Sequence, residues 1–205
     1  MIIGKTRGSC WTRFRLAPLA AAWLLTAGCA THIAPQELTN PPPSEPFSAF
    51  NRFELLPVRL ATTQQVKPAA VRKIQENIDI RLRKKIDEWN SRTVKGPIRT
   101  LIIKPEIADM KFVSGSKRFW VGPMAGSSAI VLHVSFVDKE NHRLIADPEF
   151  FARAEAWVGA WSIGATDNVM LVRIANSMAV YVLNNYDHAI GGPVYPTSEQ
   201  APEMR

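Results

Sequence analysis

Two short segments of the sequence hold side chains that could do nucleophilic or acid–base chemistry. In residues 159–164, Ser162 stands between glycines, but Ala160 occupies a position where the Gly-x-Ser-x-Gly pattern of a nucleophile elbow requires glycine. Asp147 and Glu149 flank a proline and could act as acid and base only if the fold brought them together; otherwise they form a solvated turn. A hydrolase that uses Ser162 or the two carboxylates is therefore the alternative expectation, and a non-enzymatic protein is the leading one.

The sequence does not point to a metal or a cofactor. The histidines are scattered, with no two at the spacing of a metal-ligand pair, at positions 32, 133, 142 and 188. His133 lies in an apolar run, which favours a core or half-buried side chain over a ligand. The glycines of residues 122–128 are too close together for a phosphate-binding loop, and no lysine follows the second one. We therefore expect no metal, nucleotide or other cofactor.

The most unusual stretch is the glycine-rich segment, residues 114–126, which combines glycines, two cations and two adjacent aromatic residues between two predicted strands. One interpretation is structural, with the aromatic rings capping the sheet while the glycines turn the chain. The other is an adaptable loop that presents a cation and aromatic anchors to a partner. For that second interpretation the candidate binding residues are Lys117, Arg118, Phe119, Trp120, Gly122 and Gly126.

The first 28 residues have the composition of an export signal. Residues 1–15 are basic and polar, and residues 16–25 are apolar and uncharged. A run of about ten residues is too short for a stable membrane-spanning helix, which takes roughly 20. Small residues at 26–28 then precede Cys29, as a signal peptidase requires.

Residues 24–29, Leu-Leu-Thr-Ala-Gly-Cys, resemble the lipobox of bacterial lipoproteins, with Thr26 at the position where leucine is usual. The resemblance implies that the chain is cut before Cys29 and that this residue carries diacylglycerol and a fatty acyl chain such as palmitate. Ala30 in the next position implies sorting to the outer membrane, on the periplasmic face, with the inner membrane as the alternative. Several acyl chains make such an anchor effectively permanent.

Cleavage before Cys29 also changes the charge of the protein. Four of the 25 basic residues and none of the 18 acidic residues precede Cys29, so 21 basic and 18 acidic residues remain. The net charge falls from +7 to +3, which is too small and too dispersed to indicate a nucleic-acid partner. Cys10 is removed with the signal, so the mature chain cannot form an internal disulfide.

Prolines and glycines predict the boundaries of the folded part. Residues 29–46 are polar and proline-rich, which predicts an extended tether between lipid and domain. Residues 191–205, with Gly191, Gly192 and two prolines, are expected to form a flexible C-terminal tail. The domain is therefore predicted to span residues 47–190.

Within that domain, hydrophobic periodicity predicts two helices and several strands. A helix opening at Pro68 has apolar residues at spacings of three and four, and a second begins near residues 166–168 and ends near 184–186. Strands are predicted at 53–60, 98–113, 129–137, 143–146 and 150–158, with Pro57 marking an edge or an end and Pro105 a bulge or a break. This order predicts an α+β two-layer sandwich, a mostly antiparallel sheet with two main helices packed on one face.

Residues 47–186 resemble a family of proteobacterial lipoproteins, the domain-of-unknown-function family four-four-one-zero. The features that carry the resemblance are the glycine-rich run 115–128 leading into a strand, Ala-Asp-Pro-Glu-Phe at 146–150, and Gly-Ala-Thr-Asp-Asn at 164–168. The family is similar in architecture to the N-terminal domain of TolB and implies no activity or catalytic residues. We expect a periplasm-facing binding or assembly module with an envelope protein as partner; a carrier of a small apolar ligand is a further alternative.

Overall fold

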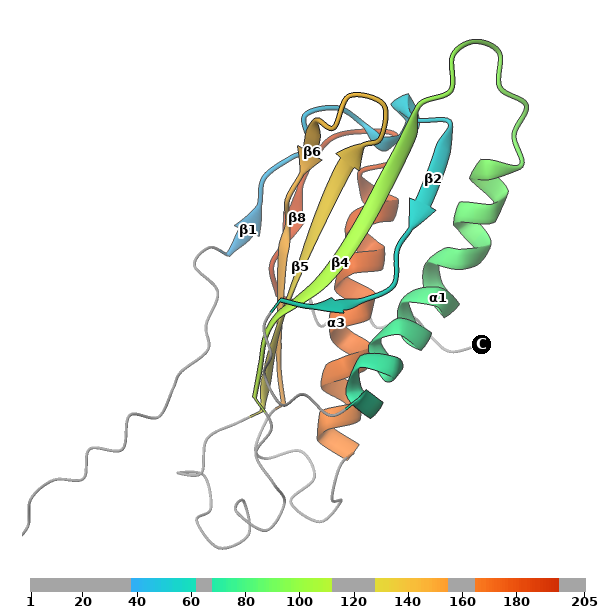
Figure 1. Ribbon diagram of the computed structural model, residues 1–205. Helices are drawn as coiled ribbons and strands as arrows, with labels where there is room; N and C mark the ends of the chain where they lie inside the picture. Colours follow the sequence, from blue (N-terminus) through green and yellow to red (C-terminus); the bar gives the residue numbers. More distant parts are fainter. Residues whose placement is uncertain (1–37, 62–67, 112–127, 155–164, 196–205) are drawn as a thin grey trace, which may run out of the picture. The chain divides into compact units, whose positions relative to one another are not determined.

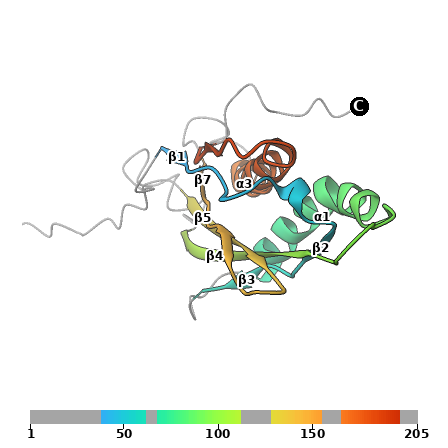
Figure 2. The ribbon, with the colours of Figure 1, turned by 90° about the horizontal axis from the view of Figure 1, so that it is seen from above.

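The computed structural model describes residues 38–61, 68–111, 128–154 and 165–195. They form a two-layer α+β sandwich, a sheet with two long helices on one of its faces (Figures 1 and 2), as the hydrophobic periodicity predicted. Within these ranges no helix is both long and apolar enough to cross a membrane.

The centre of the main sheet is an antiparallel pair of long strands, β4 and β5. Along the free side of β4 run β2 and then β3, both parallel to it, and along the free side of β5 run β6 and then β7, both antiparallel to it. The bounds are β2 Arg52–Leu55, β3 Arg59–Leu60, β4 Thr100–Lys111, β5 Ala129–Asp138, β6 Leu144–Ala146 and β7 Glu149–Arg153.

Two prolines are accommodated at the same level of the sheet. Pro57 lies in the gap between β2 and β3, so β4 has no partner on that side between Ile103, opposite the end of β2, and Glu106, opposite the start of β3. Pro105 lies within that gap and remains paired in register with β5 on its other side. The prediction of a bulge or break at Pro105 was wrong: proline lacks only the N–H, and none is needed there. The irregularity in β4 falls later, between Ile107 and Asp109.

Both helices, α1 (Pro68–Asn90) and α3 (Ala165–Asn184), lie on the same side of the sheet and run in the same direction (Figures 1 and 2). α1 connects β3 to the parallel strand β4, which requires a crossover of this kind. Its predicted apolar stripe is buried, with Val71 only partly so, and so are the inward residues of α3. The core between the layers consists mainly of Ile74, Ile78, Leu82, Trp89, Leu101, Ile103, Leu132, Val134, Phe136, Phe150, Ile174, Met178 and Val182.

The segments on either side of the predicted domain belong to the fold, which corrects the expected boundaries at 46 and 191. β1 (Thr39–Asn40) pairs antiparallel with β8 (Gly192–Pro193). A short 3₁₀ helix, Phe47–Ala49, lies between β1 and β2 in the chain. Its Phe47 ring stacks on the Phe136 ring, with 4.7 Å between the ring centroids. Val194 is buried against Val131 and Phe151, on the face of the sheet that is turned away from the helices. The prolines exclude a helix or central strand in residues 41–46, as predicted, but not docking of this segment.

Asparagine side chains take the place of a neighbouring strand at both sides of the sheet. The Asn90 amide accepts from the N–H of Phe53 at 2.8 Å and donates to its carbonyl at 2.9 Å, on the outer side of β2. Asn40 makes the same two bonds, both 2.8 Å, with the backbone of Glu149 in β7. Each side chain thereby satisfies one donor and one acceptor that an edge strand would otherwise leave open.

Candidate functional site

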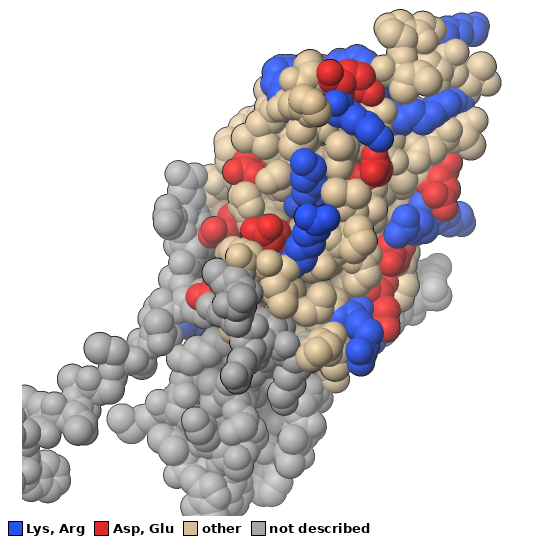
Figure 3. Space-filling view, viewed as in Figure 1, with Lys and Arg blue, Asp and Glu red and all other residues tan. Residues whose placement is uncertain are grey.

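The face of the sheet opposite the helices carries three polar residues that the sequence singled out, His133, Asp147 and Glu149. Because successive strand residues point to opposite faces, the burial of Val134 and Phe136 under the helices places His133 and Ser135 on the other, open face. Figure 3 views this side and shows basic side chains interspersed with acidic ones over its described part. The open face is therefore a mixed-charge surface.

Strand register brings four ionisable residues into one row across the open face. Arg59 of β3 lies opposite Glu106 of β4, which lies opposite His133 of β5, which in turn lies opposite Glu149 of β7. Directly opposed residues have Cβ atoms about 5 Å apart and share a face. The row therefore alternates cation, anion, imidazole and anion over four strands.

Asp147 joins this row from the turn between β6 and β7. Its Oδ1 atom lies 2.9 Å from His133 Nε2 and accepts a hydrogen bond of 2.9 Å from Ser135 Oγ. The residue types are those of a Ser–His–Asp triad, but the order of contacts is different. In a triad the serine donates to the histidine, which then takes its proton. Here serine and histidine both contact the carboxylate, so these contacts do not place His133 to take the proton of Ser135.

The same contacts bear on the hypothesis that Asp147 and Glu149 act as an acid–base pair. The Asp147 carboxylate is engaged by His133 and Ser135, while the backbone of Glu149 is held by Asn40. The Asp147 side chain is 43% exposed. No group of three or more His, Cys, Asp or Glu side chains in the described ranges is placed to hold a metal ion.

A second polar cluster, the Arg99 cluster, lies at the end of the sheet. The Arg99 guanidinium makes two 3.0 Å bonds to the Glu45 carboxylate and one of 2.7 Å to Asp138 Oδ2, and lies 4.3 Å above the Phe50 ring. Arg143 also contacts Glu45. No sequence motif could have revealed this cluster, because Glu45 and Asp138 are 54 and 39 residues from Arg99.

Electrostatics in the Arg99 cluster favour the charged forms. Hydrogen bonding to Arg99 lowers the pKa of Glu45, and this outweighs the effect of burial. Burial raises the pKa of Asp138, but hydrogen bonds from Arg99 and from the Glu140 N–H together lower it below its ordinary value. The two carboxylates raise the pKa of Arg99 in turn. The cluster therefore joins residues before β2 to the ends of β4 and β5 by charge as well as by packing.

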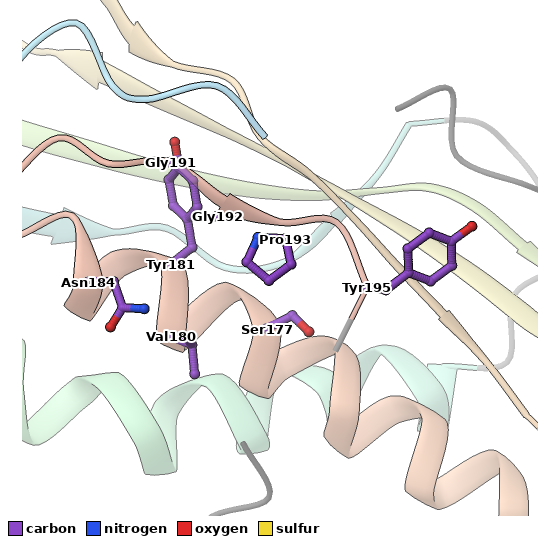
Figure 4. A pocket seen from close by; sticks show the side chains of 8 residues that line it. All are labelled: Ser177, Val180, Tyr181, Asn184, Gly191, Gly192, Pro193 and Tyr195. Carbon is purple, nitrogen blue, oxygen red and sulfur yellow. The ribbon is translucent and has the colours of Figure 1, made fainter. Parts of the chain in front are cut away.

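A small hollow lies between α3 and β8 (Figure 4). Its free volume is about 10 Å³, room for a single water molecule. Tyr181, on its wall, donates a 3.1 Å hydrogen bond to the carbonyl of Pro41, and burial raises the pKa of its hydroxyl. The hollow is lined by Ser177, Val180, Tyr181, Asn184, Gly191, Gly192, Pro193 and Tyr195.

Several residues singled out in the sequence lie outside the described residues. They are the lipidation candidate Cys29, the serine of the incomplete elbow, Ser162, and the candidate partner-binding residues Lys117, Arg118, Phe119, Trp120, Gly122 and Gly126. Their roles stay predictions.

Solved structures with a similar arrangement come from several bacteria. The dodecamer of PelC from Paraburkholderia phytofirmans is 9% identical, covers 67% of this chain and 92% of its own, and has a TM-score of 0.37. A candidate lipoprotein from Caulobacter crescentus is 11% identical (66% and 91% covered, TM-score 0.33), and a DUF330 protein from Xanthomonas campestris is 13% identical (76% and 96% covered, TM-score 0.41). Such values carry no conclusion about function.

A search of curated proteins found no significant match. The family model of a domain of unknown function, DUF4410, matches residues 31–171, which is more than half of the chain. The match covers the described strands β1 to β7 and the start of α3. The chain therefore belongs to the DUF4410 family.

Proposed function

We propose that this protein is a non-enzymatic lipoprotein of the cell envelope, anchored through Cys29, whose domain binds another envelope component close to the lipid surface. The observation that carries the proposal is the short stretch of chain between Cys29 and Leu38, the first residue that the structure describes. The lipobox-like segment ends at Cys29, and the fold already holds Leu38, whose carbonyl accepts a hydrogen bond from the N–H of Val194. The periplasmic face of the outer membrane is part of the proposal and follows from Ala30.

The distance between lipid and domain follows from the length of that stretch. Only nine residue steps separate Cys29 from Leu38. Even fully extended, nine residues reach about 30 Å. The sequence had predicted a tether running to residue 46, but the segment from Asn40 onwards is held on the domain. An anchor at Cys29 therefore keeps the edge formed by β1 and β8 within about 30 Å of the membrane.

The open face of the sheet is the part of the described surface that best suits a partner. Its row of Arg59, Glu106, His133 and Glu149 offers donors and acceptors at fixed spacing, and β-strands place them more rigidly than a loop could. Such a row selects a partner with the complementary order of polar groups. In this proposal the glycine-rich segment with Lys117, Arg118 and Trp120 contributes a second contact.

The anchor is tested by replacing Cys29 with serine in the full chain. The expected result is loss of label from a clickable palmitate analogue and release of the protein from the membrane fraction. The control is Cys10→Ser, which keeps label because Cys10 lies in the removed signal. Unchanged labelling of the Cys29→Ser chain would refute the anchor.

The binding role is tested by photo-crosslinking in cells. A photoreactive residue at Ser135, on the open face, or at Trp120 is expected to trap one discrete envelope protein. The same residue at Lys95, exposed in the loop between α1 and β4, is the control and is expected to trap none. Capture of nothing from either Ser135 or Trp120, with the lipid anchor intact, rejects the binding role alone.

A further inference from the structure

The outward face of α1 carries a regular stripe of exposed residues. Lys73, Glu76, Ile80, Lys84 and Asp87 follow one another at steps of three and four residues, which places them on one side of the helix. All five are exposed, and Ile80, at the centre, is 76% exposed, the most exposed of the large hydrophobic side chains that the structure describes.

The outward face of α3 carries a stripe with the same steps, made of Val169, Val172, Asn176, Val180 and Leu183. Val169 and Leu183 are exposed, and the other three are half-buried. Four of the five are aliphatic, which is unusual for the solvent side of a helix. Apolar surface gathered in this way marks a contact with another molecule more often than scattered residues do.

The centres of the two stripes lie side by side. Arg81, next to Ile80 in α1, donates a hydrogen bond of 3.3 Å from its Nε to the Asn176 Oδ1 atom in α3. The two helices also run in the same direction (Figure 1). Consider one two-fold axis that runs perpendicular to the helices and passes close to Ile80 and Asn176. It would place each stripe antiparallel against the same stripe of a second copy.

Reversal of the α1 stripe produces complementary pairs. Lys73 would face Asp87 of a second copy, Glu76 would face Lys84, and Ile80 would face itself. Each charged residue thus meets its opposite, and the one apolar residue meets its own kind on the axis. A closed two-fold contact requires this kind of self-complementary surface.

Reversal of the α3 stripe brings apolar residues together. Val169 would face Leu183 of the second copy, Val172 would face Val180, and Asn176 would lie opposite its counterpart on the axis. A shift by one helical turn would place Asn176, whose Oδ1 accepts a hydrogen bond from Arg81, against a valine of the second copy.

We propose that the outer face of the helical layer, formed by these two stripes, is the contact between two copies of this chain related by a two-fold axis. Two neighbouring helices about 30 Å long and 10 Å wide present roughly 600 Å² per copy. The total of roughly 1,200 Å² reaches the size of specific interfaces. The dimer leaves the open face of the sheet free for the partner of the proposed function, and it does not depend on the lipid anchor.

Disulfide trapping in membranes tests the geometry, using the full chain with single introduced cysteines. Ile80→Cys lies on the axis and is expected to form a linked dimer under mild oxidation. Val169→Cys alone is expected not to link, because antiparallel packing separates the two copies of residue 169 by about 20 Å along α3, whereas a disulfide needs Cα atoms within about 7 Å. Chains carrying Val169→Cys mixed with chains carrying Leu183→Cys are expected to link. The parent chain, which carries no introduced cysteine, is the control for disulfides formed through Cys29.

Absence of linkage at Ile80→Cys, or self-linkage of Val169→Cys as strong as that of Ile80→Cys, would overturn the proposal. A charge reversal gives an independent measurement. Lys84→Glu places like charges opposite Glu76 twice in the dimer and is expected to weaken dimerisation, measured by light scattering of the detergent-solubilised protein, about tenfold. Adding Glu76→Lys to the same chain is expected to restore the dimer. A monomeric mass for the parent chain at every concentration rejects the proposal outright.

Discussion

Replacement of Arg99 by methionine removes the cation that holds the Arg99 cluster together. Methionine keeps an apolar stem over the Phe50 ring, so the main loss is electrostatic. Asp138 is only 1% exposed and would keep only the Glu140 N–H and the Asn141 amide as partners. Breaking a buried ion pair from one side costs about 3–5 kcal/mol. Because Arg99 itself is 32% exposed, we expect a loss of about 2–3 kcal/mol from the free energy of unfolding.

The same change should alter the dependence of stability on pH. In the folded protein the pKa values of Glu45 and Asp138 are lowered, so the folded state binds these protons less readily than the unfolded chain does. Their contribution to stability is complete above the ordinary carboxyl pKa values and is lost as pH falls through the lowered folded values. Below about pH 5 the parent protein should therefore lose stability as acid is added, and Arg99→Met should lose less.

Urea unfolding followed by circular dichroism measures both effects, at pH 7 and at steps down to pH 3. The midpoint should fall at an unchanged slope, because the surface exposed on unfolding is the same. Arg143→Met is the matched control: it removes another cation from Glu45, but that arginine is 49% exposed, so the expected loss is below about 1 kcal/mol. A loss for Arg99→Met no larger than that of the control would refute the reasoning that Arg99 stabilises the fold mainly by pairing with the buried Asp138.

Three further substitutions test the docking of the chain ends. Phe47→Ala should lower the free energy of unfolding, measured by thermal unfolding, by about 3–5 kcal/mol, because its ring is fully buried. A loss below about 0.5 kcal/mol, as for a surface residue, would mean that the N-terminal segment is not packed on the domain. Gly191→Ala should cost at least about 2 kcal/mol and remove hydrogen-exchange protection from β1 and β8, because φ is +77° and a Cβ would lie 2.4 Å from the Asn40 carbonyl oxygen. Gly96→Ala, also at positive φ but with open space around it, is its control and should cost about 1 kcal/mol. The Asn185 side chain accepts hydrogen bonds from the N–H groups of Ile190 and Gly191, just before β8. Asn185→Ala removes this acceptor and should lower the free energy of unfolding by about 3 kcal/mol; an unchanged stability would contradict a structural role for these two bonds.

The layers of the fold were predictable because they depend on local periodicity. The apolar steps after Pro68 define α1, which buries one face, and the apolar, β-branched run of residues 129–137 defines β5. The antiparallel pairing of β5 with β6 followed from the turn residues between them. The two-layer arrangement then follows, because one sheet face must cover two apolar helix faces.

The chain ends and the polar clusters were not predictable in the same way. Proline-rich composition indicated an extended chain in residues 41–46, but not that Tyr181 and Asn40 would hold it on the domain. Asp147 and His133 were noticed separately, and only the register of β5 and β7 brings them together. Contacts of this kind join residues far apart in sequence, and each residue type alone is common on any protein surface.

The asparagines on the two sides of the sheet have a consequence for chemical ageing. Asn40 and Asn90 each act through one donor and one acceptor of the same amide. Deamidation begins when the backbone N–H of the next residue attacks the side-chain amide, so Asn40, which precedes Pro41, is protected, and Asn90 is not. At Asn90 it would exchange the nitrogen for an oxygen, leaving the shape unchanged but placing a negative charge against a backbone carbonyl. The Phe53 N–H would still find an acceptor, while the Phe53 carbonyl would lose its donor and be opened to a foreign strand. Hydrogen exchange and aggregation of Asn90→Asp would show whether the covering of β2 depends on this single atom.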